Sequence, residues 1–266
     1  MGSGGIEISI LFPAFVAGLI VLSTHVPLGQ QVLRRGIVFI DLAIAQVAGL
    51  GVTIAGASGS DPHGWTVQLA AGAAALVGAL LLTWTEKKWP EVQEALIGVL
   101  FVAAACIELL LLANNPHGGE HLKDLLTGQI LWVSLSSLWP IALFYAVALA
   151  IWFRFRERLG VVGFYVLFAL VVTQSVQLVG VYLVFASLIV PALAARRFAP
   201  RLSLVVGYGV GIAGYVLGLI ASSLYDLPTG ATIVVAVIAA FVVSVIVSAL
   251  APQSMRAEPV ALATAH

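Results

Sequence analysis

Long apolar stretches recur along the whole chain and are separated by short polar connections. A membrane-spanning helix needs roughly 20 mostly apolar residues, whereas a strand of a membrane barrel needs only about 10. The stretches are too long for such strands, and the backbone inside lipid must satisfy its own hydrogen bonds, so the pattern predicts an all-α polytopic membrane protein. The apolar runs are 8–28, 37–57, 65–85, 92–113, 130–153, 161–178, 180–195, 203–224 and 229–250.

Residues 159–195 decide the expected number of crossings. They lie between two clusters of arginine, and a single helix of that length would extend ~55 Å, too long for one span. Two short crossings that turn near Gln177 to Gly180 fit the segment, and a broken or re-entrant element fits it as well. We therefore expect about nine transmembrane helices, with eight as the alternative. No soluble linker divides the chain, so residues 1–266 are expected to form one transmembrane domain with a tail at 251–266.

The composition agrees with a membrane protein and excludes several functions. Hydrophobic residues make up 61% of the chain, charged residues 9%, and the mean hydropathy is +1.11. The sequence contains no Gly-rich phosphate loop, no zinc-type Cys/His spacing and no long polar block. We therefore expect no enzymatic activity of its own, no permanently bound cofactor and no nucleic-acid partner.

The basic residues fall in alternate connections and predict the orientation. Short loops rich in Lys and Arg remain in the cytoplasm. If the N-terminus lies outside and the C-terminus in the cytoplasm, only Lys123 among the twelve basic residues falls outside. The eleven expected inside are Arg34, Arg35, Lys87, Lys88, Arg154, Arg156, Arg158, Arg196, Arg197, Arg201 and Arg256.

The stretch VPALAARRFAPR at 190–201 holds three of the twelve basic residues within six positions. Pro191 follows an apolar run, lacks a backbone donor and discourages further regular helix. The residues after it are thus expected to form a short basic segment at the cytoplasmic face. From the residues alone, this segment is either a positive-inside anchor or a docking site.

Four stretches carry a resemblance to a known family. LVGVYLVFASLIVPALAARRFA is similar to the span end and Ile-Pro-Ala-x-x-Ala-Arg-Arg motif of the permeases in zinc- and manganese-type ABC importers. PLGQQVLRRGIVFIDLAIAQVAGLG, EALIGVLF with LLTGQILWVS, and SSLYDLPTGATIVV resemble further segments of the same permeases, in the same order. Together they cover most of the chain.

The resemblance implies an architecture like that of type II ABC importer permeases, a function and a set of partners. The chain would be the transmembrane subunit of an ATP-driven importer of zinc, manganese or iron in the bacterial inner membrane. It would act as a homodimer with two ABC ATPase subunits inside and a metal-binding receptor outside. Residues 191–201 would form the segment that couples the spans to the ATPase, with these contact residues: Pro191, Arg196, Arg197, Phe198 and Arg201.

The sequence departs from the family pattern in two places. The family usually has Asp-x-x-x-His in its second span, whereas here Gln46 stands at the histidine position and Asp41 lies five residues earlier. That spacing puts the two side chains about 140° apart on a helix. Glutamine is a poor zinc ligand, and an amide oxygen suits harder ions better. The chain is also roughly 20 residues shorter than the family usually is before VGVYLVF, where an Asp-containing stretch is missing.

Acidic residues inside apolar runs are candidates for a metal pathway. A charged side chain in a span costs a few kcal/mol and is a functional candidate by default. Glu108 is expected either to line the pathway or gate in the outer half of its span, or to lie within reach of the outer interface in a paired or protonated form. Asp41 and Glu94 lie near cytoplasmic span ends, where an acid also favours a helix N-terminus.

The connection NNPHGGEHLKD supplies a second set of candidate ligands on chemical grounds alone. His117, Glu120 and His121 lie within five residues and could bind zinc or manganese at the outer mouth.

Two alternative functions stay open at this point. The chain could be a stand-alone, proton-coupled secondary transporter with Glu108 and Asp41 as the relay. The inverted repeats that such carriers often show are not evident here. It could also be an ABC permease for a metal chelate or another small solute, and neither the metal nor the direction of transport follows from the residues.

Overall fold

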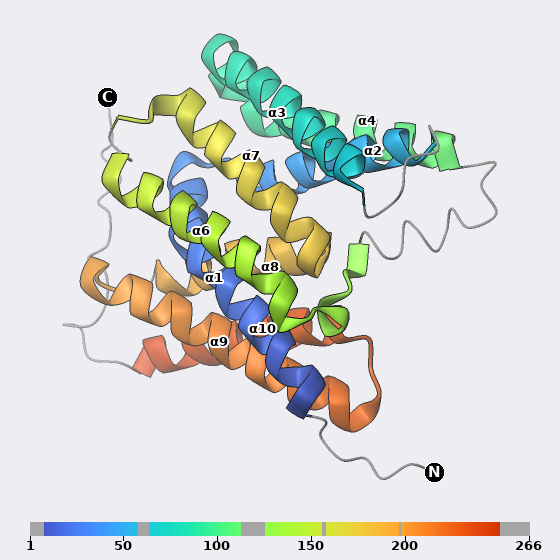
Figure 1. Ribbon diagram of the computed structural model, residues 1–266. Coiled ribbons are helices and arrows are strands. Elements are labelled where there is room, and N and C mark those ends of the chain that lie inside the picture. Colours follow the sequence, from blue (N-terminus) through green and yellow to red (C-terminus); the bar gives the residue numbers. More distant parts are fainter. Residues whose placement is uncertain (1–7, 58–63, 113–125, 156–157, 197, 251–266) are drawn as a thin grey trace, which may run out of the picture.

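The computed structural model describes residues 8–57, 64–112, 126–155, 158–196 and 198–250 (Figure 1). Its regular elements in these ranges are helices, which confirms the all-α membrane fold. They are α1 (Ile8–Arg35), α2 (Ile40–Ala57), α3 (Trp65–Lys88), η1 (Pro90–Val92), α4 (Gln93–Leu112), η2 (Ile130–Trp132), α6 (Leu135–Phe155), α7 (Gly160–Val179), α8 (Val181–Ala195), α9 (Pro200–Tyr225) and α10 (Thr229–Leu250).

Two groups of helices flank a buried centre. In Figure 1, α2, α3 and α4 lie together in the upper part of the bundle, and α9 and α10 lie together in the lower part. Between them α8 packs against α1, α9 and α10, and most of its side chains are buried. In contrast, α4 and α10 expose most of their apolar side chains, as expected of helices that face lipid or another subunit.

The segment 159–195 crosses the bundle twice, as α7 and α8. Among the described helices, eight are long and apolar enough to span a membrane, whereas α8 is an apolar helix of 15 residues. A helix of this length extends ~22 Å, less than the ~30 Å hydrocarbon core. The shorter length is compatible with the position of α8, because its neighbours in the bundle surround it. The turn between α7 and α8 falls at Gly180, at the edge of the predicted range.

The basic helix ends meet at one end of the bundle. Arg35, at the end of α1, forms a 3.5 Å ion pair with Glu86 near the end of α3. Its guanidinium also lies 4.5 Å from the ring centre of Phe164 in the first turns of α7, and that ring packs against Trp152 near the end of α6. The arginines and lysines that close α1, α3 and α6 thus share one face, as the positive-inside pattern requires.

Pro191 corrects one expectation. It lies inside α8, which continues to Ala195, so the proline does not end the helix. A proline within a membrane helix is tolerated where neighbouring groups satisfy the freed backbone, and Pro191, Ala192, Ala194 and Ala195 are buried in the bundle. The exposed part of the proposed coupling segment therefore begins at Arg196.

A close backbone contact fixes the α7–α8 turn. Gly180 has φ +82°, a conformation that favours glycine, and a Cβ there would collide with the backbone of Thr127 and Gly128. The turn therefore requires glycine for two reasons, its backbone conformation and the space around it.

We predict that Gly180→Ala lowers the thermal stability of the purified protein more than Gly36→Ala does. Gly36 has φ +71°, and no atom lies within 4 Å of the place that a Cβ would occupy, so its substitution adds only the backbone cost of about 1 kcal/mol. Melting curves in one detergent would compare the two variants. Equal losses would mean that the backbone contact at Gly180 is not tight.

Candidate functional site

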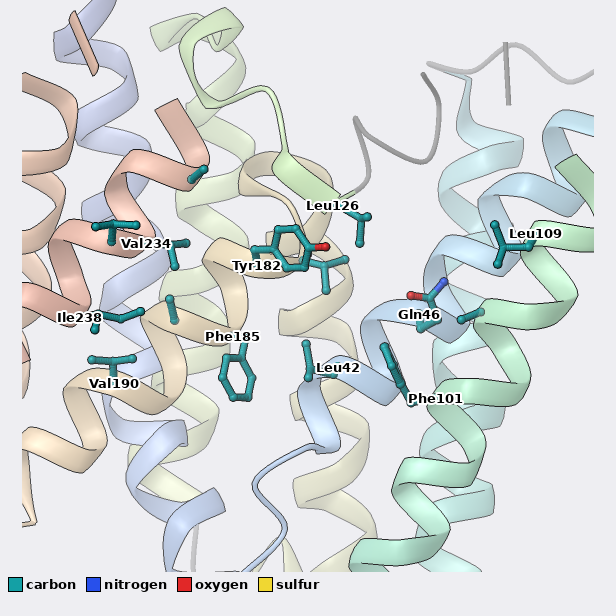
Figure 2. A pocket seen from close by; sticks show the side chains of 15 residues that line it. Leu42, Gln46, Phe101, Leu109, Leu126, Tyr182, Phe185, Val190, Val234 and Ile238 are labelled. Carbon is teal, nitrogen blue, oxygen red and sulfur yellow. The ribbon is translucent and has the colours of Figure 1, made fainter. Parts of the chain in front are cut away.

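A cavity of about 580 Å³ lies between α2, α4, α8 and α10. Figure 2 shows α8 and α10 on one side of it and α2 and α4 on the other. Most of its fifteen lining residues are apolar, among them Leu42, Phe101 and Phe185. Two of the lining side chains carry polar groups, the amide of Gln46 and the hydroxyl of Tyr182.

Behind the cavity wall, Gln46 is bonded to a buried carboxylate. The Nε2 group of Gln46 donates a hydrogen bond to Oε2 of Glu108. Thr53, two helical turns further along α2, donates from Oγ1 to the other carboxylate oxygen of Glu108 at 2.8 Å. Glu108 is 1% exposed, so the polar side chains of α2 hold this acid inside an apolar bundle.

The spacing of residues in each helix explains this meeting. The buried residues of α4 are Gln93, Ile97, Ala104 and Glu108, whose separations of four and seven keep them on one face. Gln46 and Thr53 are likewise seven residues apart, so both can reach the same acid from α2. Sequence reasoning singled out Gln46 and Glu108 separately but missed their pairing and the part of Thr53. The seven-residue spacing of polar or buried residues on both helices was the sequence pattern that could have indicated this contact.

Two further acids, Asp41 and Glu94, lie toward the basic end of α2 and α4. Oε1 of Glu94 accepts a hydrogen bond from the backbone N–H of Phe39 at 3.2 Å. Asp41, in the first turn of α2, is 1% exposed. Both oxygens of Asp41 and Oε2 of Glu94 are buried without a hydrogen-bond partner among the described residues, although the backbone N–H groups of Asp41 and Leu42 lie near the Asp41 carboxylate.

Asp41 and Gln46 therefore belong to different pairs. Asp41 and Glu94 lie in the first turns of α2 and α4, whereas Gln46 bonds to Glu108 further along the helix. Across the described ranges, no group of three or more His, Cys, Asp and Glu side chains is arranged to hold a metal ion.

The other predicted residues lie at the ends of the bundle or outside the described ranges. Arg196 is exposed at the end of α8, and Phe198 is half-buried just beyond it. Arg201 lies in the first turn of α9. Arg197 and the three ligands predicted in the loop, His117, Glu120 and His121, lie outside the residues that the structure describes.

Comparison with known proteins identifies the family. The model of a family described as the ABC 3 transport family matches residues 7–165 and 158–248. The chain belongs to this family. The predicted resemblance to zinc- and manganese-type permeases is thereby confirmed, and the ABC 3 chain is a membrane permease subunit rather than an ATPase.

Two curated relatives align with most of the ABC 3 chain. The high-affinity zinc uptake system membrane protein ZnuB of Haemophilus influenzae is 25% identical over 256 residues, covering 88% of this chain and 96% of that protein. The manganese transport system membrane protein MntC of Halalkalibacterium halodurans is 26% identical over 247 residues, covering 85% and 83%.

A solved structure has the same fold. PsaBC from Streptococcus pneumoniae, determined in complex with Fab, matches with a TM-score of 0.70 and 21% identity, covering 92% of each chain. At this identity the match supports the permease architecture and not the chemistry of individual residues.

We predict that Gln46 and Glu108 are energetically coupled. A double-mutant cycle of Gln46→Ala and Glu108→Ala should give a coupling energy of about 0.6 kcal/mol and at most about 1.7 kcal/mol, the mean and the maximum measured for hydrogen bonds between membrane helices. Reversible unfolding in mixed micelles would measure it. Cys106→Ala, an exposed position on α4, combined with Gln46→Ala serves as the control and should be additive. Additivity of the Gln46 and Glu108 variants would contradict the pairing.

Proposed function

We propose that the chain is the transmembrane subunit of an ATP-driven importer for a divalent transition metal: zinc, manganese or iron. The observation that carries this proposal is the row of polar side chains that α2 and α4 bury beside the cavity. Burying a carboxylate in so apolar a bundle costs free energy, so such a residue is a functional candidate by default. Relatives named for zinc uptake and for manganese transport support the choice of cargo.

The polar groups are spread along the direction that a cation would travel. Thr53 and Asp41 are separated by twelve residues of α2, roughly 18 Å of helix. Gln46 with Glu108 occupies the middle of this row, and Asp41 with Glu94 lies toward the basic end. Of this row, the amide of Gln46 lines the cavity, and the buried carboxylates and the Thr53 hydroxyl lie behind it on the same two helices.

The proposed assembly is a homodimer in the bacterial inner membrane, with its ion path along the two-fold axis. Two ATPase subunits would bind the basic, cytoplasmic end, and a metal-binding receptor would dock at the opposite end. The N-terminus would lie outside and the C-terminus inside. Arg196 and Phe198 would contact the ATPase, because they follow directly on the buried α8, and the neighbouring Arg197 and Arg201 would belong to the same contact.

We predict that Glu108→Gln and Asp41→Asn each reduce ATP-dependent metal uptake severely. Each substitution keeps the shape of the side chain and removes a buried carboxyl group close to the cavity. Proteoliposomes that contain the chain with its ATPase and receptor would be assayed with zinc, manganese and iron. Cys106→Ala is the matched control on α4 and should transport normally.

The same reconstitution separates this proposal from a proton-coupled carrier. Uptake should require both the ATPase subunit and ATP. Metal movement by the purified chain alone, driven by a proton gradient, would reject the importer and favour the carrier.

We also predict that the Arg196→Ala, Arg197→Ala double variant loses ATPase coupling. Removing both guanidinium groups should weaken binding of the ATPase subunit, because Arg supplies the planar donors that pair with carboxylates. Co-purification and transport-coupled ATP hydrolysis would measure the loss. Arg154→Ala, an exposed arginine that closes α6, is the control and should retain both. Unchanged assembly and coupling in the double variant would reject the docking role.

A further inference from the structure

The basic end of α3 carries two tryptophans and two lysines in the stretch WTEKKWP. Trp84 and Lys88 are four residues apart and therefore lie on one face of the helix. α3 ends at Lys88, where the backbone N–H of Trp89 donates to the carbonyl of Thr85 at 2.7 Å and Pro90 begins η1. Trp89 is thereby fixed beside the last turn, and the two indoles meet edge to face with their ring centres 5.2 Å apart.

These two rings hold one ammonium group between them. The Nζ atom of Lys88 lies 4.5 Å from the ring centre of Trp89 and 5.0 Å from that of Trp84. At such distances a cation is attracted to the face of an indole, which limits the positions that the lysine side chain adopts. Because an aromatic ring has no net charge, the rings position the charge of Lys88 without neutralising it.

Both lysines of this turn are exposed and available to an anion. Within the described ranges neither Lys87 nor Lys88 forms an ion pair, and the neighbouring Glu86 is paired with Arg35 of α1. Glu91 is the other acid of the turn, and it is exposed and has no ion pair in that part of the chain. With two such cations and one such anion, the turn keeps a net positive charge.

An apolar stripe on α3 leads away from the lysines. Val77, Leu80 and Leu81 are exposed, and Trp84 continues the stripe to the end of the helix. From Val77 to Lys88 the helix extends roughly 16 Å, about the depth of one leaflet of a ~30 Å hydrocarbon core. Figure 1 shows α3 along the upper edge of the bundle.

We propose that Trp84, Lys88 and Trp89 bind the headgroup of an anionic phospholipid in the leaflet at the basic end of the bundle, with Lys87 as a second cation. The lysines pair with the phosphate, as basic residues next to a membrane helix do with anionic lipids. The indole N–H groups donate at the depth of the headgroups, where tryptophan is favoured. One acyl chain lies along the apolar stripe. This inference concerns the lipid partner and does not depend on the cargo or on ATP.

The charge of the turn favours a lipid over a second copy of the chain. A protein interface over this face would bury the apolar stripe together with both lysines, and removing an unpaired ion from water is strongly unfavourable. A two-fold contact between two copies of the same face would also bring like charges together. A lipid leaves the lysines at the membrane surface, in contact with the phosphate and with water.

The test measures lipid binding to the purified full chain in detergent by native mass spectrometry. Dioleoyl phosphatidylglycerol should bind about 25-fold more tightly than dioleoyl phosphatidylcholine, since each lysine near an anionic headgroup contributes about fivefold. The double variant Lys87→Gln, Lys88→Gln should lose this preference, whereas Lys88→Arg keeps the charge and the ring contacts and should retain it. Arg154→Gln removes an exposed positive charge from the end of α6 and is the control, which should bind both lipids as the wild type does.

A second double variant tests the rings. Trp84→Leu with Trp89→Leu keeps both lysines and an apolar surface but removes the cation–π contacts, so the preference for phosphatidylglycerol should fall severalfold.

Three results would overturn the inference. The first is equal binding of the two lipids by the wild-type chain, a comparison that needs no variant to fold. The second is an equal loss of preference in Arg154→Gln and in the lysine double variant, which would indicate a general effect of charge. The third is a change of oligomeric state in the lysine double variant with an unchanged lipid preference, which would assign this face to a second copy.

Discussion

The burial of Glu108 is the constraint on which the rest of the site depends. A carboxylate within a lipid-embedded bundle lacks the water that would stabilise it, so it must find donors in the protein. It finds them in α2, where Gln46 and Thr53 each donate to one of its oxygens. These bonds join α4 to α2 at a depth where both helices are otherwise apolar. They also orient the amide of Gln46, which lines the cavity.

The opposite wall depends on close packing instead of polar contacts. α8 is shorter than the hydrocarbon core, yet it is buried because small residues let its neighbours approach. A Cβ at Gly29 of α1 would collide with the Leu188 carbonyl of α8, and one at Gly207 of α9 would lie 3.4 Å from the Pro191 carbonyl oxygen of α8. The apolar wall and the polar wall thus have different physical origins, and the cavity lies where they face each other.

Length, hydropathy and charge were sufficient to predict the helical fold, the turn near Gly180 and the collection of basic helix ends at one face. The prediction that Pro191 ends its helix was wrong, because it took no account of the neighbouring groups that let α8 continue to Ala195. They also missed the partner of Gln46. The spacing within α2 places Asp41 and Gln46 about 140° apart, so it indicates that Asp41 is not the partner of Gln46. It does not indicate that the partner is Glu108 of α4, because spacing along one helix carries no information about its contacts with another.

A pair built on two helices behaves differently from a pair built on one. Two ligands one turn apart on a single helix keep their separation when that helix moves as a body. Gln46 and Glu108 do so only while α2 and α4 keep their relative position, since each helix supplies one partner. A displacement of α4 against α2 would break this hydrogen bond and leave the Gln46 amide free to rotate. The orientation of a side chain that lines the cavity is thereby linked to the relative position of two helices.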